Sequence, residues 1–189
     1  CYGLGAACSS SAMIFAMHQV KVACLVRHGQ GNGWRDAMLG RLVENQWLLA
    51  SSTTEGGNGG NIRSSDAAVV RTDDGFTYSR EASVISYGEY ADALVTTARR
   101  APDAASSDQV LLWLMADDYT MERRQGWETL GMRGTCSRGF RVEAAGSADR
   151  ILDVPYSKIH TQTMMPVAHL LWSSAWAGLA SASVERTRQ

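Results

Sequence analysis

The apolar residues of this 189-residue chain change their spacing twice, which limits the folds open to it. Between residues 9 and 46 they recur at steps of three and four, a spacing that predicts helices. Between residues 66 and 154, short runs of strand-forming residues follow one another without a helical period. After Pro155 the helical spacing returns. The sequence therefore predicts an α+β chain with helices before and after a central β-domain.

Capping residues place the ends of the predicted helices. Ser9, Ser10 and Ser11 can cap a first helix that runs to about Arg27, and Asn45 is expected to end a second, shorter one. Thr163 is expected to cap the last helix, with Pro166 in its first turn, where proline is tolerated.

An Asp-Asp-Gly turn gives the strongest strand signal. Asp73-Asp74-Gly75 separates two β-rich runs, 67–71 and 76–86, and Asp-Gly suits a tight hairpin. Further strands are expected at 93–98, 110–116, 139–144 and 151–154. Because no helical pattern interrupts them, we expect an antiparallel, barrel-like β-domain or a sandwich.

Between the first helices and the strands lies the run Thr53-Thr54-Glu55-Gly56-Gly57-Asn58-Gly59-Gly60-Asn61. Its glycines and asparagines let successive backbone amides turn inward and form a concave surface of donors for an anion. The run is therefore a candidate cradle for a phosphate or the edge of a flavin. An ordinary polar surface loop is the competing interpretation.

Charge and cysteine content exclude several classes of protein. The formal charge is −1 without any block of like charge, so a nucleic-acid or lipid-surface protein is not expected. Four scattered cysteines lack metal-ligand spacing and point to a reducing, cytoplasmic setting. No carboxylate or cysteine completes a ligand set around His18 or His28, so no metal site is expected. Polar interruptions of the apolar runs predict a soluble protein.

Four segments together resemble a known family. Thr54–Asn61 resembles a Thr-Glu-Pro-x-x-Gly-Ser-Asp signature, and Trp127–Thr135 resembles a Leu-Gly-x-Arg-x-Ser/Thr segment. Ser83–Gly88 takes the place of a Trp-Ile-Thr-Asn-Gly strand, and Ala177–Ala180 that of a Gly-Leu/Ile-Ala helix core. These are motifs of the acyl-CoA dehydrogenases, in the same order. The resemblance covers most of the chain.

The resemblance implies a division of the chain. Residues 1–46 would end an N-terminal helical domain, 47–157 would form the central β-domain, and 158–189 would be the first helix of a C-terminal helical bundle. FAD would bind between the last two domains. The chain would thus be a fragment of a longer protein.

The resemblance also implies roles for single residues. Thr53 and Thr54 would face the flavin ring, Gly59 and Gly60 would approach the pyrophosphate, and Ser86 would lie near flavin N5. The resemblance implies no metal ligand among these residues.

Several positions depart from the family pattern. Val84 stands in place of a shielding aromatic residue, Gly56 in place of Pro, Gly60 in place of Ser and Asn61 in place of Asp. These departures indicate a divergent branch, whose acyl substrate could differ from a simple fatty acyl thioester. Arg133 is expected to have a structural role, as an ion pair or a contact to a carbonyl.

The family activity is α,β-dehydrogenation of an acyl thioester by a carboxylate base and FAD. The base is expected beyond Gln189, and the alternative base position falls near Ala168, beside His169. We therefore expect the fragment alone to be inactive and His169 to lie near the site.

The resemblance further implies fatty-acid metabolism, an acyl-CoA substrate, electron-transfer flavoprotein or a similar acceptor, and a homo-oligomeric full-length form. Two alternatives stay open. One is a related flavin monooxygenase or oxidase of the same fold. The other is a non-catalytic scaffold that kept the β-domain.

Overall fold

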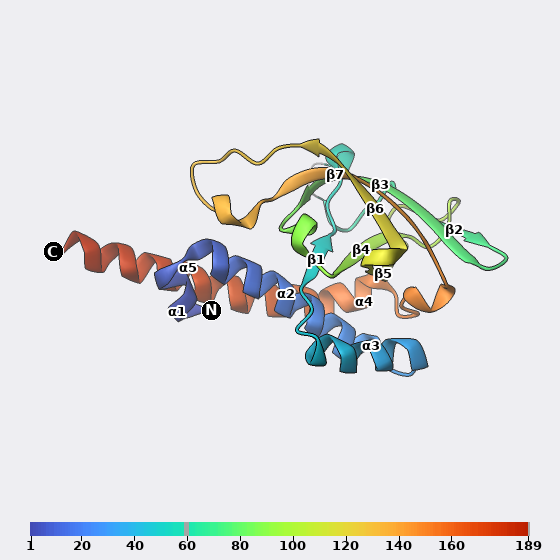
Figure 1. Ribbon diagram of the computed structural model, residues 1–189, viewed down its shortest axis with the longest axis horizontal. Coiled ribbons are helices and arrows are strands. Elements are labelled where there is room, and N and C mark those ends of the chain that lie inside the picture. The colour runs from blue at the N-terminus through green and yellow to red at the C-terminus, as the bar shows by residue number, and fades with distance from the viewer. Residues whose placement is uncertain (59–60, 189) are drawn as a thin grey trace.

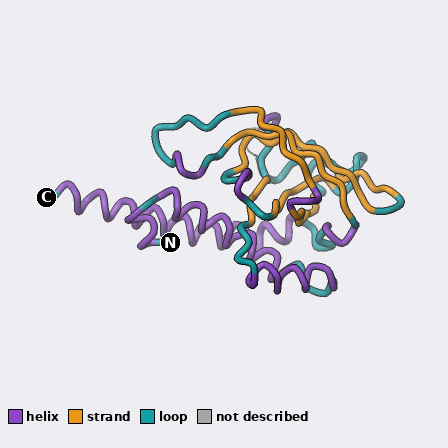
Figure 2. Tube along the Cα trace, viewed as in Figure 1, coloured by secondary structure: helices purple, strands orange, loops and turns teal. Residues whose placement is uncertain are grey.

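The protein has a helical part and a β-part that lie side by side, as the computed structural model shows for residues 1–58 and 61–188 (Figure 1). The strands gather on one side and the long helices on the other (Figure 2). The last helix extends well beyond the β-part toward the C-terminus (Figure 1). The chain is α+β, as the sequence predicts.

Helices open and close the described chain. They are α1 (Tyr2–Ala7), α2 (Ser9–His28), α3 (Gly33–Glu44), α4 (Tyr156–Ile159) and α5 (Met165–Thr187). A π-helical turn, His160–Met164, joins α4 to α5. By length and composition alone α2 could cross a membrane. In the structure it packs against α5 and β1, and its Lys21 is buried.

The strands form two sheets. The smaller sheet has the order β1 (Leu49–Ser52), β4 (Ala93–Arg99) and β5 (Gln109–Met115). The larger sheet has the order β2 (Val69–Thr72), β3 (Gly75–Ile85), β7 (Arg138–Gly146) and β6 (Tyr119–Gln125). β1 runs parallel to β4, and the other pairs are antiparallel.

Of the two β-architectures expected from the sequence, the barrel-like one is wrong, because the two sheets do not close into a barrel. They face each other across a core that includes Phe76, Tyr78, Leu112 and Phe140. The other face of the smaller sheet packs on the helices through residues such as Trp113. Both faces of β4 and β5 are therefore covered, which explains why these strands are buried at almost every position.

Most predicted strands are confirmed. The Asp73-Asp74 turn joins β2 to β3, and a β-carbon on Gly75 would collide with the carbonyl oxygen of Gly146. The expected strand at 151–154 is reduced to a single bridge between Ile151 and Leu112. The sequence gives no signal for β6, because this exposed edge strand is largely polar and charged.

Two predicted helix caps are wrong. Cys8, not a serine, precedes the first residue of α2, and no side-chain cap bond is present there. Thr163 lies inside the π-helical turn, because helical structure already starts at Tyr156. Pro166 lies in the first turn of α5, as predicted, and a proline that lacks an N–H favours such a local change of hydrogen bonding. The predicted end of α3 at Asn45 is confirmed.

Small residues bring α1 and α5 into close contact. A β-carbon on Gly5 would collide with the carbonyl oxygen of Ala175, and one on Gly178 would collide with that of Tyr2. The backbones of the two helices can approach this closely only because both positions are glycine. The small residues of the last helix therefore serve the close packing that the sequence predicts.

Candidate functional site

A cavity of about 380 Å³ lies where the helices meet the β-part. Its volume falls within the range of about 300–1,000 Å³ that is typical of small-molecule sites. Three of the predicted cofactor-binding residues, Thr53, Thr54 and Ser86, line it. They come from two segments, the loop after β1 and the end of β3, which we call the sheet wall. The structure thus brings together the two motifs that the sequence analysis links to a flavin.

The other two predicted cofactor-binding residues, Gly59 and Gly60, lie outside the described residues. The preceding part of the glycine run, Gly56–Asn58, forms one 3₁₀ turn, and Gly56 and Gly57 are exposed. Their role at a pyrophosphate therefore stays a prediction.

A β-bulge gives the sheet wall its shape. The pairing of β3 with β7 shifts between Ala82 and Ile85. In a regular strand, neighbouring side chains point to opposite faces, whereas a bulge can redirect one of them. Here both Ser83 and Val84 line the cavity, and the Ser83 hydroxyl donates to Thr54 Oγ1 at 3.4 Å. The bulge thus joins the end of β3 to the loop after β1.

A buried ion pair fixes the start of the glycine run. Arg80 on β3 and Glu55 in the loop are almost completely buried, and Arg80 Nη2 lies 3.2 Å from Glu55 Oε1. Arg80 Nη1 also donates to the carbonyl oxygens of Ser52 and Thr97, at 3.1 and 2.6 Å. The guanidinium group therefore connects β1, β4 and the loop through these contacts.

Glu55 accepts further hydrogen bonds from the far end of the same loop. The Ser65 hydroxyl and the Asp66 amide donate to its carboxylate at 2.8 and 2.6 Å, and the Ala67 amide at 3.3 Å. These donors satisfy the oxygens of a carboxylate that is buried. Glu55 thus joins the start of the loop, next to Thr53 and Thr54, to residues 65–67.

A chain of hydroxyl groups holds Ser86. Its Oγ lies 2.8 Å from Ser137 Oγ, which lies 2.7 Å from Thr135 Oγ1. The amide of the next residue, Tyr87, donates to the Thr135 carbonyl at 2.7 Å. Thr135 belongs to the segment that resembles the Leu-Gly-x-Arg motif. This second motif therefore supports the sheet wall rather than lining the cavity itself.

Arg133, in the same segment, is exposed and donates to the carbonyl oxygen of Thr129 at 3.3 Å. This is the carbonyl contact that the sequence analysis offers as one of two structural roles. Trp127 is half-buried, and its indole N–H donates to the carbonyl oxygen of Met132 at 3.1 Å. Both residues therefore stabilise this segment by hydrogen bonds to its own backbone carbonyls.

The helices form the opposite wall, which we call the helix wall. It includes Lys21 on α2, together with Met164, Ala168 and Trp172. Ala168, the alternative base position, lines the cavity, whereas His169 is an exposed residue of α5 and does not line it. No aspartate or glutamate of the described chain lines this cavity.

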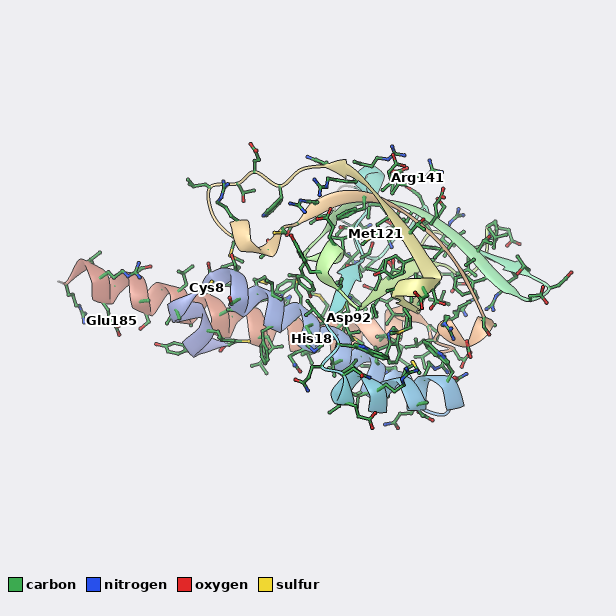
Figure 3. The ribbon with its side chains drawn as sticks, in the orientation of Figure 1. Cys8, His18, Asp92, Met121, Arg141 and Glu185 are labelled. Carbon is green, nitrogen blue, oxygen red and sulfur yellow. The ribbon has the colours of Figure 1, made fainter. Side chains whose placement is uncertain are left out.

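The two histidines of α2 make hydrogen bonds within the fold. His18 Nδ1 accepts from the Leu49 amide at 3.1 Å, and burial lowers the pKa of His18. Figure 3 shows His18 where α2 passes the start of the smaller sheet. His28 Nε2 lies 2.7 Å from Thr163 Oγ1. These contacts fit the structural role that the sequence favours for both.

Lys21, Glu55 and Arg80 are the residues of the site that sequence reasoning did not single out. Burial lowers the pKa of Lys21 from 10.5 to about 8. A sequence signal does exist for Arg80, since it occupies an inward position of the alternating strand β3. Lys21 likewise interrupts the apolar stripe of α2, where a charged residue calls for a reason.

Comparison with solved structures identifies the fold. Butyryl-CoA dehydrogenase from Megasphaera elsdenii superposes with a TM-score of 0.78 at 17% identity, over 96% of this chain and 48% of its own. A prolyl acyl carrier protein oxidase gives 0.79 at 20% identity, over 98% and 50%. Dibenzothiophene monooxygenase from Paenibacillus gives 0.75 at 19% identity, over 96% and 47%.

The chain therefore has the acyl-CoA dehydrogenase fold, and it spans about half the length of these structures. No family model matches the sequence, and no curated protein matches it either. The fold that the motif resemblance implies is confirmed at this level. Dehydrogenases, oxidases and monooxygenases all share it, so the fold alone does not choose among their reactions.

Proposed function

We propose that the full-length protein is an FAD-dependent oxidoreductase acting on an acyl thioester, and that this chain supplies the β-domain half of its flavin site. The observation that carries the proposal is the meeting of Thr53, Thr54 and Ser86 on one wall of one cavity. Two motifs that resemble flavin-binding segments lie apart in the sequence, and the fold unites them. The structures that share the fold include FAD-dependent dehydrogenases.

The cavity suits a flavin ring chemically. An isoalloxazine has an apolar face and a polar edge of ring nitrogens and carbonyls. Thr53, Thr54 and Ser86 supply hydroxyl groups on the sheet wall, and the remaining lining is mostly apolar. Val84 lines the cavity at the position that the family fills with an aromatic residue, so it shields the ring without stacking.

Different residues of the chain have different roles in the proposed flavin site. Thr53 and Thr54 would orient the flavin edge by hydrogen bonds, and Ser86, held by the Ser137 hydroxyl, would lie near N5. The apolar lining excludes water, which strengthens these polar contacts. Gly59 and Gly60 are proposed to receive the pyrophosphate. When bound, FAD supplies an acceptor for the hydride equivalent taken from the acyl β-carbon.

A base must remove the α-proton of the acyl thioester. Because the described cavity lining contains no carboxylate, we propose that the base lies in a part of the protein outside this chain. Accordingly, residues 1–189 alone have no dehydrogenase activity. His169, exposed on the helix next to Ala168, remains a candidate to face the site in the full-length protein.

The acyl-CoA substrate, an electron-transfer flavoprotein acceptor, a cytoplasmic location and a homo-oligomeric state belong to the same proposal. An oxygen-dependent reaction is the second candidate. It is favoured by the oxidase and the monooxygenase among the structures of the same fold. Peroxide release during turnover in air separates an oxidase from a dehydrogenase that needs a carrier protein.

The proposal is tested on the purified full-length protein. We expect a yellow protein with flavin absorbance that releases FAD on denaturation. The flavin-free form should gain thermal stability with excess FAD but gain nothing from riboflavin or ADP alone. A colourless protein that excess FAD does not stabilise would overturn the proposal.

A further inference from the structure

Lys21 is a buried cation in the helix wall of the same cavity. It is 3% exposed and lines the cavity from α2. Among the described residues, its Nζ has one close polar contact, to the thioether sulfur of Met164 at 3.9 Å. None of the ion pairs between described residues includes Lys21.

The Met164 sulfur is a poor partner for this ammonium group. A thioether is only a weak acceptor, and the Tyr156 hydroxyl donates to the same sulfur at 3.4 Å. Two buried donors therefore share one weak acceptor. A buried charge normally has an opposite charge beside it, because loss of its hydration is otherwise costly.

The surroundings of Lys21 favour an added anion. The titratable groups that act on it are Cys24 and the cationic Arg80, and Lys21 in turn acts on His160. Its pKa of about 8 leaves most molecules protonated at neutral pH. The described lining of the cavity offers no acidic residue, and Lys21 is its one charged side chain.

We propose that Lys21 binds a carboxylate at the distal end of the acyl group, so that the substrates are ω-carboxyacyl thioesters. This inference rests on the proposed function, because the flavin occupies the sheet wall and the acyl group extends along the helix wall. Thr53, Ser86 and Lys21 line the same cavity, so a thioester end placed beside Thr53 and Ser86 would direct the tail toward Lys21. The tail carboxylate supplies the counter-ion that the described residues do not provide.

Paired substrates test the inference directly. Glutaryl-, adipoyl- and suberoyl-CoA are each compared with the unsubstituted acyl-CoA of equal carbon number. Binding to the full-length protein is measured by calorimetry and by the change in flavin absorbance. We expect one ω-carboxyacyl chain length to bind at least about tenfold more tightly than its partner, as a charge-assisted hydrogen bond allows.

Variants at the two lysines of the chain provide the controls. Lys21→Met should abolish or reverse the preference, and Lys21→Arg should keep part of it through the retained charge. Lys158 is exposed, so Lys158→Met should bind like the unaltered protein. A preference that survives in Lys21→Met would overturn the inference, as would its absence from the unaltered protein at every chain length.

The same experiment separates this inference from the proposed function. FAD content is measured first in each variant, and Lys21→Met should hold as much FAD as the unaltered protein. If no variant binds FAD, the proposed function fails. Calorimetry of the thioester pairs on the flavin-free protein then still decides whether Lys21 selects a carboxylate.

Discussion

Arg80 and Lys21 are both buried cations near one cavity, yet the chain surrounds them differently. Arg80 is 2% exposed and has the Glu55 carboxylate, two backbone carbonyls and the hydroxyls of Thr96 and Thr97 within reach. Lys21 is 3% exposed, and within the described part of the chain its one close polar contact is the thioether of Met164. A third buried cation, Arg35, donates to two carbonyls and to Asp153.

The difference teaches how to separate structural from functional charges in this molecule. Arg80 and Arg35 sit where the chain provides acceptors, so each connects elements that would otherwise be held only by apolar contacts. Lys21 connects nothing through a strong acceptor. A charge that a fold buries without a partner costs stability, and a ligand that supplies the partner gives a reason to keep it.

The largest effect is expected at Arg80. Arg80→Met leaves the Glu55 carboxylate buried without its cation, and we expect unfolding free energy to fall by about 3–5 kcal/mol. Urea unfolding of the protein measures it. The matched control is Arg141→Met, because Arg141 is 42% exposed on the larger sheet and its ion pairs should contribute less than about 1 kcal/mol (Figure 3). Equal losses in the two variants would remove the distinction drawn for Arg80.

Replacement of Lys21 is expected to raise the unfolding free energy, not to lower it. Burial lowers its pKa from 10.5 to about 8, so the unfolded chain binds more protons than the folded chain between these two pH values. Stability therefore rises with pH across this window, and the full penalty is present below pH 8. Lys21→Met should be more stable by about 3 kcal/mol at pH 7.

The pH dependence sharpens this prediction. The advantage of Lys21→Met should shrink as the pH rises from about 8 to 10.5, where the native lysine is neutral. Comparing the two proteins at each pH cancels the titration of groups on which Lys21 does not act, such as Tyr87 and Tyr156. A Lys21→Met protein that is less stable at pH 7 would show that the chain already satisfies this charge.

The packing of the helices beside the cavity can be changed by a substitution that leaves Lys21 in place. Gly178→Leu places a side chain against the Tyr2 carbonyl and should cost about 1–3 kcal/mol by separating α1 from α5. Gly40 on α3 has open space around it, so Gly40→Ala should raise stability by about 0.5–1 kcal/mol. Thermal unfolding of the two variants should therefore shift in opposite directions.

The smallest loss of stability is expected in the hydroxyl chain of the sheet wall. Ser137→Ala removes the link between Ser86 and Thr135 and should cost about 1 kcal/mol. FAD binding should weaken as well, because Ser86 loses the partner that orients it. Thr77→Ala, on the exposed side of β3, is the control and should change neither quantity. Unaltered FAD affinity in Ser137→Ala would separate Ser86 from the flavin.

Local signals predict much of this fold. The Asp73-Asp74-Gly75 turn, the apolar runs of β4 and β5 and the helical spacing all depend on neighbouring residues, and they are found as expected. The division of the strands between two sheets could not be predicted, because the parallel pairing of β1 with β4 joins distant segments. β6 has the composition of an edge strand and gives no local signal.

The candidate site shows the same limit. The two motifs identify Thr53, Thr54 and Ser86, and the structure unites them at one cavity. Glu55 and Arg80 form their pair only through the tertiary fold, and nothing in α2 indicates that Lys21 would face the same cavity. Trp172 and Trp176 of the last helix are 38% and 45% exposed.

Titration of FAD into the flavin-free, full-length protein tests the central claim most directly, because the claim is that the sheet wall holds the flavin. We expect one FAD per chain, an affinity that falls about tenfold in the Thr53→Val, Ser86→Ala double variant, and no change in Lys21→Met. An affinity that is lost in Lys21→Met but kept in the double variant would contradict the assignment of the two walls.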